Sequence, residues 1–161
     1  MRKHRLILCT ILCMLTLMLS THAEEGSSAS TSTTKPGLAH VKIEIVDLRN
    51  TKGQLVFGVF KSADGFPTVE KKSVYWQVLK KFDSKKVTFE VDLPPGRYTG
   101  SVLHDENGDG VINYNLIGVP VEGYGVTNNP KPALRQATFD EAVFTVPPEG
   151  ITKQISLQYF R

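Results

Sequence analysis

The sequence predicts an all-β fold, an antiparallel β-sandwich of about seven strands with one long, ordered loop rich in glycine and asparagine. Three observations predict it. Apolar and polar residues alternate along several short segments, turns containing Pro and Gly separate these segments, and residues 104–129 are too many for a hairpin connection. Such alternation is typical of half-buried strands. Short strands separated by such turns are typical of sandwiches.

The N-terminus has the pattern of a signal peptide. Residues 1–23 combine a basic head, an apolar run of about 14 residues and small residues before Glu24. The run is shorter than the roughly 20 residues of a membrane-spanning helix. We therefore expect cleavage near Ala23, with no transmembrane span afterwards, and a periplasmic or secreted protein. The alternative is an uncleaved N-terminal anchor.

The rest of the chain divides into a linker and one domain. Residues 24–37 are rich in Ser and Thr and show no apolar periodicity, which predicts a flexible linker. The domain then spans residues 38–161. Three of the 19 basic residues lie in the first five positions, so 16 basic and 16 acidic residues follow the signal segment. This neutral balance argues against a nucleic-acid partner.

Loss of the signal segment also removes every cysteine. Cys9 and Cys13 are the two cysteines of the chain, and both precede Ala23. The exported chain would therefore contain no thiol. This excludes cysteine nucleophiles, thiolate metal sites and disulfide redox chemistry.

Six segments of the domain alternate like strands. In residues 40–48, for example, Val41, Ile43 and Ile45 share one face. Residues 67–82 allow two interpretations, a helix or a short helical turn followed by a strand over 74–79. The β-branched and aromatic content of 74–79 favours the strand. The other five segments are 53–61, 86–93, 97–105, 142–146 and 151–160.

Residues 104–129 form the loop on which the functional hypotheses depend. Loops longer than about 12–15 residues are usually functional or disordered, and the apolar content of this one argues against disorder. Oxygen-bearing side chains alternate at Asp105, Asn107 and Asp109, and the carbonyl of Val111 follows. Ca²⁺ needs six to eight oxygen ligands on such a tight curve.

The match to a calcium-binding loop is incomplete. Its twelfth position, where a bidentate glutamate normally binds the ion, is Leu116, so Glu122 would have to fold back to supply a carboxylate. Asp, Asn and Gly also dominate turns for backbone reasons alone. Two interpretations therefore stay open, a weak Ca²⁺ site and a turn held by its own hydrogen bonds.

Residues 93–129 resemble the signature of the DUF2141 family of exported bacterial proteins. The resemblance extends from about residue 41 to the C-terminus, with Thr127 and Val119 as conservative departures. It implies an exported β-sandwich of the transthyretin- or immunoglobulin-like kind and no assigned activity. The matching features are Leu93, Pro94, Gly96, Tyr98, His104 to Asn107, Gly118, Pro120, Glu122, Tyr124, Gly125, Asn128 and Asn129.

Other constellations in the loop give weaker hypotheses. His104 with Glu122 could serve a small hydrolase, but no nucleophile stands near them in the sequence, and bracing of the loop is the alternative role of His104. Tyr114 and Tyr124 could stack on a sugar ring or pack the loop onto the sandwich. The candidate ligand-binding residues are His104, Tyr114, Glu122, Tyr124 and Asn128.

These observations predict an exported, non-enzymatic binding or structural module of the cell envelope, whose loop 104–129 is a candidate for stabilisation by Ca²⁺. Two alternatives remain. One is a module that binds carbohydrate or another envelope polymer through Tyr114 and Tyr124. The other is a small hydrolase using His104 and Glu122. The expected partner is an envelope polymer or protein.

Overall fold

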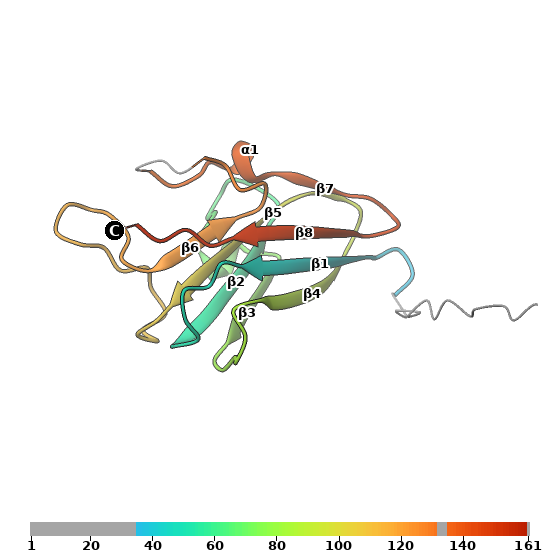
Figure 1. Cartoon of the computed structure of the whole chain (residues 1–161). Helices are drawn as coiled ribbons and strands as arrows, with labels where there is room; N and C mark the ends of the chain where they lie inside the picture. The colour runs from blue at the N-terminus through green and yellow to red at the C-terminus, as the bar shows by residue number, and fades with distance from the viewer. Residues whose placement is uncertain (1–34, 132–134, 161) are drawn as a thin grey trace, which may run out of the picture. The chain divides into compact units, whose positions relative to one another are not determined.

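The chain folds into two β-sheets, as the computed structural model in Figure 1 shows. The structure describes residues 35–131 and 135–160. The predicted signal peptide and all but three residues of the predicted linker lie outside the described residues. Within them the fold is nearly all β, which confirms the predicted class. The elements are β1 (Ala39–Val46), β2 (Gln54–Phe60), the 3-10 helix η1 (Glu70–Lys72), β3 (Tyr75–Leu79), β4 (Val87–Leu93), β5 (Gly96–Asp105), β6 (Gly123–Val126), α1 (Phe139–Ala142), β7 (Phe144–Val146) and β8 (Ile151–Ser156).

The smaller sheet has the strand order β4-β1-β8, and the larger has the order β3-β2-β5-β6, with β7 paired to the start of β5. One pair departs from the expected antiparallel pattern, because β1 and β8 run parallel. These two strands come from opposite ends of the domain. No hairpin joins them, so none imposes an antiparallel direction.

The core lies between the two sheets. β1 alternates strictly between buried and half-buried residues, and β4 between buried and exposed ones, as their sequences predict. The rings of Phe57 from β2 and Phe89 from β4 stack across the core, with 4.8 Å between their centroids. Burial of such side chains contributes roughly 1.5–3 kcal/mol each. This core fixes the larger sheet on which the candidate site is built.

Two predictions about local structure have definite outcomes. The strand interpretation of residues 67–82 is confirmed, with η1 as the helical turn before β3. The expectation of one uninterrupted loop over 104–129 is wrong toward its end, since Gly123–Val126 form β6, whereas β5 ends at Asp105 as the predicted strand 97–105 does. Gly123 and Gly125 hide this strand because glycine has low strand propensity.

Packing explains why glycines stand in β6. A Cβ atom on Gly123 would lie 2.2 Å from the Tyr159 ring, and one on Gly125 would lie 2.6 Å from Ile155. The absence of these side chains lets the C-terminal segment close over the strand. β6 thereby joins the larger sheet and carries Tyr124 to the sheet's outer face.

Candidate ligand pocket and its loop

The larger sheet has two apolar faces, and only one of them faces the core. Directly opposed residues of antiparallel strands share a face. Phe57 and Val102 form such a pair on the core face, whereas Val56 and Leu103 form the next pair on the outer face. Every residue from Leu55 to Phe60 is buried. The outer face of the sheet is therefore apolar and needs a cover of its own.

Aromatic side chains from outside the sheet and from its edge strand β3 cover part of this face. Phe66 packs edge-on against Phe60, with 5.6 Å between ring centroids, and against Phe139 of α1 at 6.1 Å. The Ser101 hydroxyl of β5 donates a 2.7 Å hydrogen bond to the Pro67 carbonyl. Trp76 of β3 lies across the strand position of Gly58. Within residues 35–131 and 135–160, these contacts leave the portion of the face nearest residues 106–122 without such a cover.

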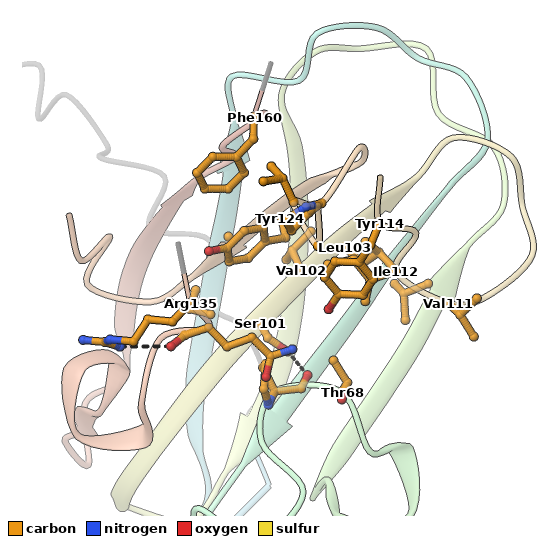
Figure 2. A pocket seen from close by; sticks show the side chains of 18 of the residues that line it. Thr68, Ser101, Val102, Leu103, Val111, Ile112, Tyr114, Tyr124, Arg135 and Phe160 are labelled. Carbon is orange, nitrogen blue, oxygen red and sulfur yellow. Dashed lines mark hydrogen bonds between the residues drawn. The ribbon is translucent and has the colours of Figure 1, made fainter. Parts of the chain in front are cut away.

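A pocket of about 520 Å³ occupies that portion of the outer face (Figure 2). Its floor is the outer face itself, with Val56, Trp76 and Leu103 among its residues. The loop of residues 106–122 forms a wall that includes Ile112 and Tyr114. The Tyr124 and Phe160 rings, stacked with 5.9 Å between centroids, close another side. The volume falls in the range of small-molecule sites.

Asp105, the last residue of β5, organises the start of the loop. Its buried carboxylate accepts backbone N–H groups of Gly108 at 2.6 Å, Asp109 at 3.2 Å and Gly110 at 2.7 Å. The Gln54 side-chain amide donates to it at 2.7 Å. Gly108 and Gly110 have φ of 78° and 84°, in the left-handed region that glycine adopts without strain. A buried carboxylate with four donors is fully satisfied.

Glu122 closes the base of the loop. One of its carboxylate oxygens accepts the backbone N–H of Glu106 at 3.1 Å, and the other accepts that of Asn113 at 3.0 Å. Its side chain is only 4% exposed. A single buried carboxylate therefore ties together the two halves of the loop, which limits how far the pocket wall can move.

His104 is buried behind the loop with both ring nitrogens in use. Nε2 lies 2.8 Å from the Lys52 carbonyl, and Nδ1 lies 2.7 Å from the Tyr159 hydroxyl. Because a carbonyl oxygen can only accept, Nε2 carries the proton, and in the neutral ring Nδ1 accepts the hydroxyl proton of Tyr159. This arrangement favours the bracing role of His104 and leaves neither nitrogen for a substrate.

Arg49 connects Tyr159, the partner of His104, to the loop. Its Nε donates to Glu106 at 2.5 Å, and its terminal nitrogen donates to the Val121 carbonyl at 3.1 Å. Its guanidinium lies 4.6 Å above the Tyr159 ring centroid. Burial raises the pKa of Glu106, but the hydrogen bond and the positive charge of Arg49 contribute to a larger shift in the opposite direction. The pKa of Glu106 is therefore below its usual value.

Two side chains of the predicted calcium site, Asn107 and Asp109, lie together with Asn113 at the exposed part of the loop. One carboxylate oxygen of Asp109 accepts the side-chain amides of Asn107 at 2.9 Å and Asn113 at 3.0 Å. Its other oxygen accepts the Val111 N–H at 2.9 Å, and this bond together with the two amides lowers the pKa of Asp109. Among residues 35–131 and 135–160, no three His, Cys, Asp or Glu side chains are placed to bind a metal. Any ion here would therefore need amide and carbonyl oxygens.

The predicted ligand residues separate into two groups. Tyr114 and Tyr124 both line the pocket, from the loop and from β6 (Figure 2). Burial and the nearby Tyr114 raise the pKa of Tyr124, although Arg135 opposes this rise. His104 and Glu122 lie in the base of the loop instead. Asn128 lies elsewhere and donates a 2.7 Å hydrogen bond to the Val143 carbonyl, which braces the segment before β7.

Sequence reasoning missed most of the pocket floor. Val56, Trp76 and Leu103 come from three strands, and no local motif joins them. A signal was present in residues 55–60, LVFGVF, where an almost unbroken apolar run predicts a strand buried on both faces. Such a strand implies that other residues must cover the outer face of the sheet. Where that cover is incomplete, a pocket can form.

These features define the protein as a two-sheet, all-β domain whose larger sheet carries a loop-walled pocket on its outer face. The chain belongs to DUF2141, a family described as an uncharacterized protein conserved in bacteria, whose model matches residues 43–154. Comparison with curated proteins and with solved structures returned no match. Among the described residues, no helix has the length and apolar character needed to cross a membrane.

Proposed function

We propose that this protein is an exported, non-enzymatic binding module of the cell envelope, and that the pocket beside loop 106–122 is its ligand site. The pocket of about 520 Å³ carries the proposal. A sheet face this apolar normally packs against another element, whereas here part of it borders an open space of ligand size. Export is supported by the signal pattern of residues 1–23.

The fixed shape of the loop supports the same function. Asp105 and Glu122 together accept five backbone N–H groups of the loop, so its conformation is set before any ligand arrives. A preformed site loses less conformational entropy on binding than a flexible one. The backbone that carries Tyr114 and Ile112 is therefore fixed before these residues contact a ligand.

A fragment screen by NMR tests the proposal. We expect bound fragments to shift the indole signal of Trp76, which is the only tryptophan of the chain. Leu103→Tyr should fill the pocket floor and weaken these fragments at least fivefold. Val78→Tyr is the matched control, because Val78 also lies on the outer face but does not line the pocket. The proposal would be overturned if bound fragments left the indole signal of Trp76 unchanged, or if they bound both variants equally.

Calcium binding by the loop is a second candidate, favoured by the gathering of Asn107 and Asn113 around Asp109. The two ends of a side-chain amide are assigned from hydrogen bonds, and rotating each amide would turn its oxygen toward the carboxylate. The carbonyl of Val111 would add a ligand in the predicted register, whereas the Asp105 carboxylate is already occupied by its four donors. A site lacking a bidentate glutamate should bind weakly, in the range of about 10⁻⁴–10⁻³ M.

Thermal unfolding with EDTA and then with millimolar Ca²⁺ or Mg²⁺ tests this second candidate. Ca²⁺ at ten times its Kd should add roughly 1.4 kcal/mol of stability, a rise of a few degrees. The rise should be selective for Ca²⁺ and should disappear in Asp109→Ala. Equal midpoints in EDTA and Ca²⁺ would leave the hydrogen-bonded turn as the whole account of the loop.

A further inference from the structure

We propose that the pocket binds a hydrocarbon chain, the acyl chain of an amphiphilic molecule, in preference to a sugar. This inference rests on the proposed function and specifies its ligand. Four observations carry it: the apolar chemistry of the floor, the prior engagement of two nearby polar side chains, the extent of the pocket across the sheet, and an exposed isoleucine on its wall.

The floor of the pocket is mainly apolar. Val56 and Leu103 are cross-strand partners on the outer face, and Trp76 lies beside them on β3. The wall continues this character through Ile112, Val119 and Pro120 of the loop. Sugar sites combine an aromatic platform with several polar groups placed for hydroxyl contacts. An apolar floor of this kind leaves the hydroxyls of a sugar without partners, which is costly when they are buried.

Two polar side chains that border the pocket, those of Ser101 and Arg135, already have partners. The Ser101 hydroxyl donates to the Pro67 carbonyl at 2.7 Å. The Arg135 guanidinium forms two hydrogen bonds to the Glu141 carboxylate, at 2.9 and 2.7 Å, and a third to the Gln136 carbonyl. A sugar that used either of these side chains would have to displace these contacts. A hydrocarbon chain leaves all of them in place.

The pocket is long in the direction that crosses the strands. Its lining includes Trp76 on β3, Val56 on β2, Leu103 on β5 and Tyr124 on β6, so it extends over four neighbouring strands. Neighbouring strands lie about 4.8 Å apart, which gives a length of roughly 14 Å. This length suits an extended chain of medium length better than a single compact ring.

The loop exposes an apolar side chain that a bound hydrocarbon chain would cover. Ile117 lines the pocket and yet is 83% exposed. Its neighbour Leu116 is fully exposed and does not line the pocket. A chain in the pocket would remove the Ile117 side chain from water, and burial of apolar surface is the main source of affinity for such ligands. The adjacent pair therefore provides a test residue and its control.

Trp76 fluorescence measures binding of the chain directly, since its indole lines the pocket. Dodecanoate is the probe in solution, and vesicles of phosphatidylcholine are the probe for a chain still held in a membrane. We expect dodecanoate to shift the Trp76 emission to shorter wavelength in a saturable way and hexanoate to bind at least tenfold more weakly. Ile117→Ser should weaken dodecanoate binding about fivefold. Leu116→Ser should change it less than twofold.

The outcomes separate this inference from the function on which it rests. Saturable dodecanoate binding without a vesicle response assigns the site to free amphiphiles, and a response to both assigns it also to membrane lipids. If oligosaccharides shift Trp76 and dodecanoate does not, the pocket is a binding site and the hydrocarbon inference is wrong. If neither probe responds and the fragment screen also leaves Trp76 unchanged, the proposed function fails with it. Equal loss in Leu116→Ser and Ile117→Ser would likewise contradict the inference.

Discussion

At the scale of single residues, two carboxylates decide the shape of the loop. Asp105 and Glu122 are both buried, and each is satisfied by backbone N–H groups rather than by a basic side chain. An ionised carboxylate that accepts several N–H bonds avoids most of the cost of burial. The family motif around these positions therefore has a structural explanation that is independent of any ligand.

Replacing one of these carboxylates should loosen the loop measurably. Asp105→Asn exchanges an acceptor oxygen for an amide group that donates, so at least one backbone N–H of residues 108–110 loses its partner. We expect a loss of about 2 kcal/mol in the free energy of unfolding, measured by chemical denaturation. Asp83→Asn is the control, because Asp83 is exposed, and it should change stability by less than about 0.5 kcal/mol. Equal stability of the two variants would show that the loop does not depend on Asp105.

At the scale of elements, β6 depends on residues without side chains. Gly123→Ala would place a Cβ atom 2.2 Å from the Tyr159 ring. That ring cannot move easily, because its hydroxyl bonds to His104 and Arg49. We expect a loss of about 1–3 kcal/mol, as for other overpacked sites, measured by thermal unfolding. Gly96→Ala in β5 meets only an ordinary contact at 3.4 Å and should be close to neutral; a comparable loss there would contradict the packing argument.

The short helix α1 has a cap whose ionisation can be followed by NMR. Glu141 accepts hydrogen bonds from Arg135 and from the backbone N–H of Thr138, and these bonds lower its pKa from 4.5 to about 2. A lowered pKa means that the unfolded chain binds the proton more tightly. The contribution of Glu141 to stability is therefore complete above pH 4.5 and is lost as the pH falls toward 2. Arg135→Gln should raise this pKa toward 4.5; a wild-type value already near 4.5 would show that the cap is not formed.

Local sequence patterns predicted some elements of the fold and could not predict others. Alternation identified β1 and β4 because each has one core face and one more accessible face, and loop length identified the region that contains Tyr114 and Tyr124. Alternation could not reveal the pocket. Trp76, Leu103 and Phe160 meet there only through strand pairing and the path of the C-terminal segment, neither of which is encoded in local periodicity. The parallel pairing of β1 with β8 was hidden for the same reason.

At the scale of the whole molecule, the two faces of the larger sheet differ in how they are covered. The core face packs against β1, β4 and β8 and supplies stability without a disulfide. The described part of the chain covers the outer face only in part, and the open part is the proposed ligand site. Binding at an outer face requires no opening of the core, so substitutions such as Ile117→Ser should alter affinity while leaving stability unchanged within about 0.5 kcal/mol.

The proposed export would set where this outer face meets its ligand, and it can be tested on the whole chain. Residues 1–23 should be removed during export, because a basic head, a short apolar run and small residues before Glu24 are what signal peptidase requires. We expect intact-mass measurement of the protein from the extracytoplasmic fraction to show a chain that begins at Glu24. Ala23→Lys should block this cleavage and leave the longer chain attached to the membrane, whereas Ser28→Lys in the linker should be cleaved normally. Recovery of the uncleaved wild-type chain from the membrane would support the N-terminal anchor instead and would confine the pocket to ligands near the membrane surface.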